Sequence, residues 1–255
     1  MILPLPSQAA WERDMSMEQW KRAIDRIMVN ECILFANCVP RADHLSRSKA
    51  PLDLAYYLRH RIETVRRIWE TARTDAIALG VMIREDYDAA RLWAEYLREE
   101  MNHDKLYLSD LAKHGITAEM VAATRPFAST EQLIATLERR IMQLGSLPAV
   151  AYSVFVEWNS KHAAPLAAER AAAAFGPNCV KGAKAHIAID ERDQHDDMML
   201  EVARAVVTAR NYSIDLLAAL LAEYGALFRA YFAELDRYSS AIPAHAASRV
   251  TGAAA

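Results

Sequence analysis

Apolar residues recur every three to four positions along most of this chain, the spacing that places them on one face of an α-helix. Gly, Pro and small polar residues divide the pattern into segments. Ser16, with Gln19 three residues later as a capping-box partner, predicts the start of a helix that runs to about Asn37. The stretch from Val39 to Ala50 contains a proline and several small polar residues, and it predicts a loop.

The same signals predict the remaining helices. Pro51 is a favoured first-turn residue and opens a helix expected to end at Gly80. Gly115 is a natural cap for the helix before it. The sequence therefore predicts an all-α bundle of about seven helices. The helices after the first two are expected at Arg84 to His114, Ser129 to Gly145, Pro148 onward, Pro165 to Phe175 (short), Val180 to Arg210 and Ser213 to Tyr238.

The length of 255 residues lies at the upper edge of what one hydrophobic core serves, and neither a repeat nor a long linker divides the chain. We expect a single helical domain over residues 16–240. Residues 1–15 are expected to form an extended lead-in, and residues 241–255 a disordered tail of small and polar residues.

Composition and charge narrow the function classes. The net charge of −3 gives no electrostatic case for nucleic-acid binding. No segment reaches the ~18 uninterrupted apolar residues of a membrane helix, and the first residues lack the features of a signal peptide. The cysteines, Cys32, Cys38 and Cys179, are odd in number and lack zinc-type spacing. We expect a soluble cytoplasmic protein with neither a nucleic-acid nor a membrane partner.

A first candidate for chemistry is Glu100-x-x-His103, inside the helix expected from Arg84 to His114. Residues three apart share a helix face, and a carboxylate beside an imidazole is half a site for a metal such as iron or manganese. A surface Glu beside a packing His is the commoner outcome of this motif, so alone it is a weak signal.

Two further places in the sequence strengthen the case for a metal site. Glu157 follows an apolar run in which a lone carboxylate is costly unless it is paired or binds a cation. His186 and Asp190 lie one helical turn apart, and Asp193 continues their face. His195 is rotated about half a turn from His186 on a regular helix, so it joins that face only if the helix bulges or unwinds locally. An exposed Glu near a helix end and an acidic solvated face are the alternatives.

Together the clusters supply carboxylates and imidazoles from several long helices, which is the ligand set of a two-iron carboxylate site in a bundle. The order of Glu-x-x-His, an isolated Glu, and His-x-x-x-Asp followed by another His resembles the haem-oxygenase-like diiron oxidases. The resemblance spans roughly residues 20–240. It implies a seven-helix bundle that binds two iron ions, Fe(II)/Fe(III), and uses O₂ as co-substrate.

The resemblance also implies the ligands. Carried over position by position, they are Glu100, His103, Glu157, His186, Asp190 and a final His. The family usually places that His where this chain has Asp193, and His195 follows two residues later. We favour His195, because imidazole is the expected donor.

The resemblance further implies an oxidase or oxygenase that modifies a small molecule, such as an amino acid or fatty acid, in specialised metabolism. Aromatic residues are expected to line its substrate site (Tyr96, Tyr107, Tyr152, Phe155 and Trp158), with Arg192 or Lys184 as candidates to meet a polar head group. Two alternatives remain: a metal-independent enzyme of the same fold, thiaminase-like or related to quinone-cofactor biosynthesis, and a non-enzymatic helical interaction module. The oligomeric state stays open, a homodimer being one candidate.

Overall fold

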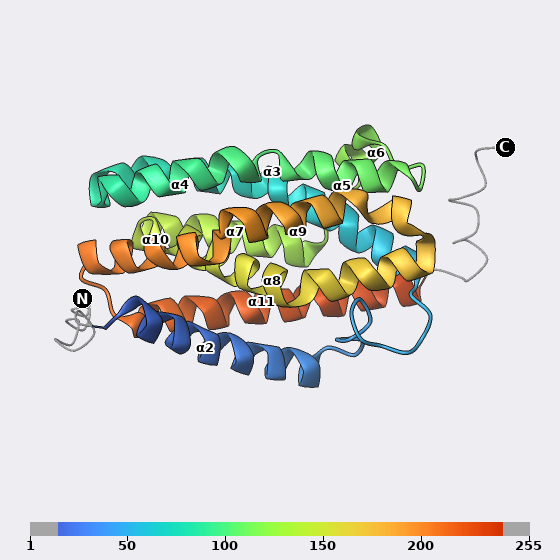
Figure 1. Cartoon of the computed structure of the whole chain (residues 1–255), viewed down its shortest axis with the longest axis horizontal. Coiled ribbons are helices and arrows are strands. Elements are labelled where there is room, and N and C mark those ends of the chain that lie inside the picture. Colours follow the sequence, from blue (N-terminus) through green and yellow to red (C-terminus); the bar gives the residue numbers. More distant parts are fainter. Residues whose placement is uncertain (1–14, 242–255) are drawn as a thin grey trace.

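The computed structural model describes residues 15–241, and over this range the chain folds into helices and loops without a β-strand. Nearly all of the expected lead-in and of the expected tail lies outside the described residues. The helices run along the long axis of the molecule (Figure 1). In chain order they are α2 (Met17–Cys38), α3 (Leu54–Glu85), α4 (Tyr87–Glu100), α5 (His103–Ala112), α6 (Ala118–Ala123), α7 (Ala128–Leu144), α8 (Leu147–Phe175), the 3₁₀ turn η1 (Pro177–Val180), α9 (Lys181–Asp193), α10 (His195–Ala209) and α11 (Ile214–Ser240).

Local sequence signals set many of the helix ends. The capping box expected at Ser16 and Gln19 is present, with both reciprocal hydrogen bonds formed. Asp53 caps α3 by accepting hydrogen bonds from two backbone amides of its first turn. Gly145 ends α7 with a φ of 77°, a conformation that glycine adopts without steric cost.

The core is built around α8 and α11. Helix α11 packs against α2, α3, α7 and α8, while α8 also contacts α9 and α10. Large side chains fill the space between these helices, among them Trp20, Trp93 and Tyr224, each at most 1 % exposed. The result is the all-α bundle that the sequence predicts.

Helix α11 has the length and apolar composition of a membrane span. A core helix of a soluble bundle has the same properties, and α11 makes the packing contacts of such a helix. Two of its charged side chains pair with other helices: Glu223 with Arg140 of α7, and Arg229 with Glu31 of α2.

Two of the predicted helices are interrupted, which corrects the expected boundaries. The helix expected from Arg84 to His114 breaks at Met101 and Asn102, so that Glu100 ends α4 and His103 begins α5. The helix expected from Val180 to Arg210 breaks at Gln194, whose φ of 53° lies in the left-handed region. The break at Gln194 is the local irregularity that His195 requires if it is to share a face with His186.

The other boundaries differ in simpler ways. Gly80 does not end its helix, because α3 continues to Glu85, where Asp86 caps the next helix. The two helices expected around Pro165 are one continuous helix, α8, which contains that proline. The short helix α6 was not predicted, since six residues carry too little periodicity to be recognised.

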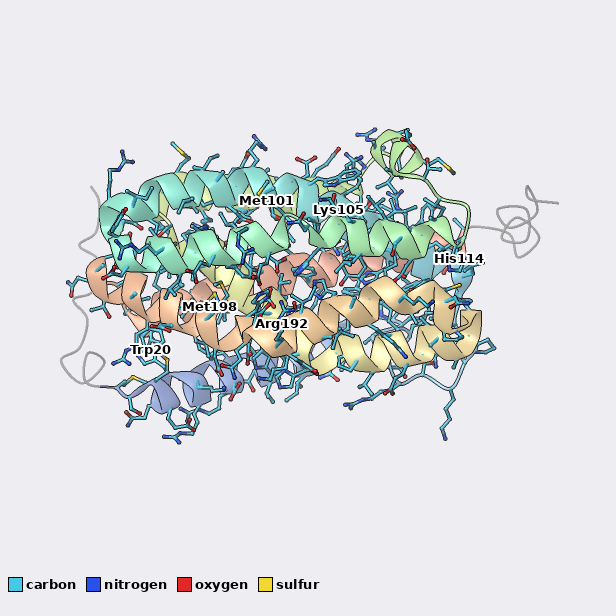
Figure 2. All side chains as sticks on the ribbon, turned by 45° about the horizontal axis from the view of Figure 1, so that its top comes forward. Trp20, Met101, Lys105, His114, Arg192 and Met198 are labelled. Carbon is cyan, nitrogen blue, oxygen red and sulfur yellow. The ribbon has the colours of Figure 1, made fainter. Side chains whose placement is uncertain are left out.

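The two breaks lie opposite each other about halfway along the bundle. Figure 2 shows the stretch labelled at Met101 and Lys105 running alongside the segment that carries Arg192. Both breaks therefore interrupt neighbouring helices at the same level, and the residues that flank them meet in the interior.

Candidate metal centre

The six residues that the sequence singles out as ligands lie in one cluster at the level of the two breaks. Glu100 comes from the end of α4, His103 from the start of α5 and Glu157 from the middle of α8. His186 and Asp190 come from α9, and His195 is the first residue of α10.

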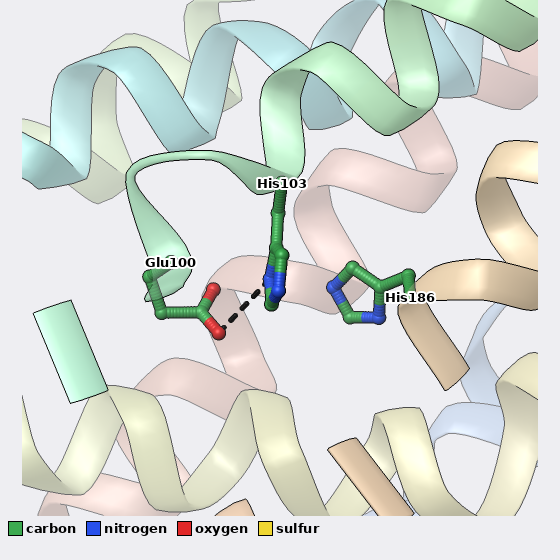
Figure 3. Close-up of side chains that lie close together, drawn as sticks. All are labelled: Glu100, His103 and His186. Atoms are coloured by element: carbon green, nitrogen blue, oxygen red, sulfur yellow. Dashed lines mark ion pairs between the residues drawn. The ribbon is translucent and has the colours of Figure 1, made fainter. Parts of the chain in front are cut away.

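Glu100, His103 and His186 form one half of the cluster (Figure 3). One ligand atom of each lies within 4.8 Å of the others. Glu100 Oε1 is 3.0 Å from His103 Nδ1, and the rings of His103 and His186 have centroids 4.2 Å apart. The tilt of 54° between the rings is not a stacked arrangement.

A close approach of α5 and α9 brings these two histidines together. A Cβ atom at Gly182 of α9 would lie 1.9 Å from the carbonyl oxygen of Leu106 in α5, so only glycine permits this distance. The Asp110 carboxylate of α5 accepts hydrogen bonds of 2.8 Å from the backbone amides of Gly182 and Ala183. The start of α9 is thereby fixed against α5.

Glu100, Glu157 and His195 form the other half, again with ligand atoms within 4.8 Å of one another. Glu157 is 3 % exposed, and Tyr96 donates a hydrogen bond of 2.8 Å to its Oε1. His195 is fully buried, with its Nδ1 3.6 Å from Glu100 Oε1. Glu100 belongs to both halves and lies between them.

Asp190 links the histidines of α9 and α10. Its Oδ2 lies 2.9 Å from His186 Nδ1, and its Oδ1 lies 3.4 Å from His195 Nδ1. Ser160 donates a hydrogen bond of 2.9 Å to Asp190 Oδ2 and so holds the carboxylate from the side of α8.

Several of these contacts are close without being hydrogen bonds. Among the residues that the structure describes, no hydrogen-bond partner is found for six buried ligand atoms: Glu100 Oε1, both ring nitrogens of His103, His186 Nδ1, Asp190 Oδ1 and His195 Nδ1. Buried polar atoms are rarely left unsatisfied, and each exception calls for an explanation. Nitrogen and carboxylate lone pairs that converge without pairing are the donor set of a metal ion.

The electrostatics of the cluster lead to the same conclusion. Burial, and then the negative charges of Glu100 and Asp190, raise the pKa of Glu157 well above its usual range. Burial acts to lower the pKa of His195, but Asp190 and Glu157 outweigh it and raise that pKa to about 9. The cluster thus carries more negative charge than its own side chains compensate. Bound divalent cations would supply the missing positive charge and reverse the upward pKa shift of Glu157.

The two candidates for the last ligand lie in different places. His195 lies inside the cluster, whereas the side chain of Asp193 is 22 % exposed and pairs with Arg192. Asp193 forms a group at the rim with Glu99 and His195, whose Nε2 lies 2.9 Å from Glu99 Oε2.

Two carboxylates near the cluster were missed by the sequence reasoning. Glu99 adjoins Glu100, and its Oε2 lies 2.9 Å from His195 Nε2. Asp75 of α3 is 7 % exposed, and burial and then Glu100 raise its pKa well above the usual range. Its position among apolar and threonine residues of α3 is the signal that could have found it.

The residues expected around a substrate divide into four sets. Tyr96 and Tyr107 contact the cluster, with ring centroids 5.4 Å from His195 and 5.3 Å from His186. Tyr152 and Phe155 are buried in the interior, whereas the exposed Lys184 and Arg192 face away from it. Trp158 donates to Asp25 and lines a small open pocket of about 120 Å³ between α2, α8 and α10.

Residues 64–224, more than half of the chain, match a family described as iron-containing redox enzymes. The chain belongs to this family. This membership confirms the resemblance found in the sequence, and it makes iron the metal to consider at the cluster.

Solved structures confirm the fold of this family member. A Shewanella denitrificans domain of unknown function, described as having a haem-oxygenase-like fold, matches with a TM-score of 0.71 and 18 % identity over 86 % of this chain and 93 % of that one. A TenA homologue from Pseudomonas syringae pv. tomato matches with a TM-score of 0.63 and 18 % identity over 91 % of this chain and 98 % of its own. At such identities the likeness concerns the fold alone. No curated protein matches the chain significantly.

Proposed function

We propose that this protein is a non-haem diiron oxidase or oxygenase that uses Fe(II) and O₂ to oxidise a small organic molecule. One observation supports it most strongly: the buried ligand atoms of Glu100, His103, His186, Asp190 and His195 converge without hydrogen-bond partners among the described residues. Membership of an iron-containing redox family supports iron as the metal.

The donors divide naturally between two ions. His103 and His186 would hold one, Glu157 and His195 the other, and Glu100 belongs to both groups. Asp190 approaches histidines of both groups. Iron bound in these positions would supply the redox chemistry with O₂.

The protein residues around the donors orient them. The Tyr96 hydroxyl holds Glu157 in place, and the Ser160 hydroxyl does the same for Asp190. Tyr107 covers the ring of His186. Burial of the cluster keeps bulk water away from the reacting region, so that a small-molecule substrate would be oxidised inside the bundle of a cytoplasmic enzyme.

Iron counting tests the proposal. The protein is loaded with Fe(II) under nitrogen and desalted, and iron per chain is measured. We expect two irons in the wild type and fewer in Glu157→Gln and His195→Ala, because each variant removes a donor. Asp193→Asn should keep both irons, and so should Glu191→Gln, an exposed neighbour of Asp190. Loss of iron in Asp193→Asn with retention in His195→Ala would reverse the assignment of the last ligand.

The same measurement separates the metal-independent alternative, which the likeness to a TenA homologue keeps in view. A wild-type protein that retains no iron after loading contradicts the diiron proposal. Oxidation of bound Fe(II) on mixing with air, followed by absorbance, provides a second readout. It should disappear in the variants that lose iron.

A further inference from the structure

The two ring nitrogens of His195 have different surroundings. Nδ1 lies 3.4 Å from Asp190 Oδ1 and 3.6 Å from Glu100 Oε1, and no hydrogen-bond partner is found for it within residues 15–241. Nε2 does have a partner, since it lies 2.9 Å from Glu99 Oε2. The imidazole therefore connects the interior of the cluster with a carboxylate at its rim.

The backbone leaves the orientation of this ring to side-chain contacts. His195 is the first residue of α10 and follows Gln194, whose φ of 53° ends α9. A helical side chain normally packs back over the turn before its own Cα, and at the first residue of a helix that turn is absent. Tyr96 meets the ring at 83° with centroids 5.4 Å apart, a contact that packs the ring without choosing between its nitrogens. The contact with Glu99 is the one that distinguishes Nε2 from Nδ1.

The other two histidines of the cluster lack such a contact. Over the described part of the chain, the carboxylate within 4.0 Å of a ring nitrogen is Glu100 for His103 and Asp190 for His186. Both of these carboxylates belong to the candidate ligands. Glu99 is therefore the one carboxylate outside the ligand set that reaches a cluster histidine within that part of the chain.

Glu99 is itself held from the solvent side. Arg98 Nη2 lies 2.8 Å from Glu99 Oε1, the oxygen that does not contact His195. The side chain of Arg98 is 74 % exposed and that of Glu99 is 22 % exposed. One carboxylate oxygen thus faces the surface and the other faces the buried imidazole. This is the arrangement in which a carboxylate accepts the N–H of a metal-binding histidine and fixes its tautomer and ring orientation.

The same atoms allow a different use of Glu99, as a metal ligand at the rim. Ligand atoms of Glu99, Asp193 and His195 lie within 4.8 Å of one another. Both rim carboxylates already have a guanidinium partner, however, Arg98 for Glu99 and Arg192 for Asp193. The interior ligand atoms have no hydrogen-bond partner among the described residues. A metal is therefore favoured on the Nδ1 side of the ring, which leaves Nε2 to Glu99.

We propose that Glu99 positions His195 for the metal position formed with Glu100 and Glu157. The carboxylate accepts the Nε2 proton, so the Nδ1 lone pair faces the interior, and its negative charge makes the imidazole a stronger donor. Glu99 is a positioning residue in this role and does not touch the metal. The inference rests on the proposed function for the assignment of His195 as a ligand.

Metal affinities test the proposal, with Fe(II) under nitrogen and with Zn(II) as a diamagnetic probe. Competition with a chromophoric chelator gives separate affinities for the two ions. We expect Glu99→Ala to weaken one of them by about 10–100-fold and to leave the other unchanged, because only one position uses His195. Glu99→Gln keeps an oxygen that accepts the Nε2 proton, so it should restore most of the affinity. A loss in Glu99→Gln as large as in Glu99→Ala would make Glu99 a ligand and overturn the proposal.

Asp193→Ala is the matched control. The Asp193 side chain is also 22 % exposed and also pairs with an arginine, but it is not among the carboxylates within 4.0 Å of a His195 ring nitrogen. It should keep both affinities. Equal losses in Asp193→Ala and Glu99→Ala would place the metal at the rim and overturn the proposal. Unchanged urea midpoints of the metal-free variants are expected, since each substitution removes contacts at the rim of the bundle.

Ring NMR of the Zn(II)-loaded protein, labelled with ¹⁵N-histidine, shows which nitrogen binds the metal. The signals of His195 are identified by their absence in His195→Ala. We expect a metal-bound Nδ1 and a protonated Nε2 whose proton exchanges slowly with water, and faster exchange in Glu99→Ala. A metal-bound Nε2 would overturn the proposal.

The same samples separate this inference from the proposed function. Two ions bound with equal affinities in wild type and Glu99→Ala would overturn the positioning role and leave the diiron function standing. Zn(II) affinities that depend on Glu99, in a protein whose bound Fe(II) is not oxidised by air, would support the positioning role and contradict the diiron oxidase.

Discussion

Glu63 and Glu157 are both buried carboxylates, but the chain compensates them in different ways. Glu63 is fully buried against Arg59 and receives two further hydrogen bonds. Glu157 receives one hydrogen bond from Tyr96 and faces other carboxylates. The first arrangement is complete within the protein, whereas the second calls for cations from outside.

Removing Glu63 should therefore destabilise the fold. We expect Glu63→Leu to lower the free energy of unfolding by about 3–5 kcal/mol, because it leaves Arg59 charged and buried without its partner. Urea denaturation measures the change. Glu70→Gln is the control: its partner Arg66 is 3.9 Å away and its own side chain is 40 % exposed, so the effect should stay within about 0.5 kcal/mol. Equal effects of the two changes would contradict this account of Glu63.

His60 should give the fold a dependence on pH. Burial, together with the charges of Arg61 and Arg67, holds its pKa well below 6.5, and its Nδ1 lies 2.9 Å from the Tyr231 hydroxyl. The unfolded chain then binds the proton more readily, so this contribution to stability is present above pH 6.5 and is lost as the pH falls. Urea midpoints at pH 7.5 and 5.5 should differ less in His60→Gln than in the wild type. Equal differences in both proteins would count against this origin.

The cluster residues were predictable from their type and spacing. Glu157, for example, is a lone carboxylate in an apolar run. The burial of Arg67 was not predictable, because α3 carries charged residues on several sides and its sequence resembles a solvated helix. Distinguishing a buried arginine from an exposed one requires knowing which face of α3 meets α11.

The positions at which helices break were the feature that the sequence predicted least well. The breaks at Met101–Asn102 and at Gln194 contain neither Gly nor Pro, so no local signal marks them. Pro165, by contrast, suggests a break within α8 that does not occur. Tertiary packing decides both outcomes, and the positions of His103 and His195 depend on it.

The crossing of α5 and α9 provides a test at this scale. Gly182→Ala should force the helices apart, because the new Cβ would overlap the Leu106 carbonyl oxygen. We expect a loss of about 1–3 kcal/mol in stability and less bound iron, since His103 and His186 lie on the two helices. Thermal unfolding and iron counting measure these effects.

Gly80→Ala is the matched control, because a Cβ at that exposed position of α3 meets nothing within 4 Å. It should gain about 0.5–1 kcal/mol through helix propensity and keep its iron. Retention of full iron binding in Gly182→Ala would contradict the positioning role of the crossing.

For the whole molecule, the candidate centre connects segments that are distant in sequence, on α4, α5, α8, α9 and α10. Ligands that bind only the folded state stabilise it, and Fe(II) at a hundred times its dissociation constant should add about 2.7 kcal/mol. Hydrogen exchange should slow on loading at residues 99–104 and 190–196. It should change little in α2, which contributes no donor. Equal slowing in α2 would indicate general stabilisation instead of binding at the cluster.

The break positions have a further consequence for charge. Each places the amino end of a helix at the cluster, because His103 is the first residue of α5 and His195 the first residue of α10. A helix amino terminus carries roughly half a unit of positive charge from its aligned peptide dipoles. Each break also places a helix carboxyl end beside the cluster, since α4 ends at Glu100 and α9 ends at Asp193, and the opposite partial charge there offsets part of this effect. This fixed charge belongs to the backbone, so it remains in place whether or not iron is bound.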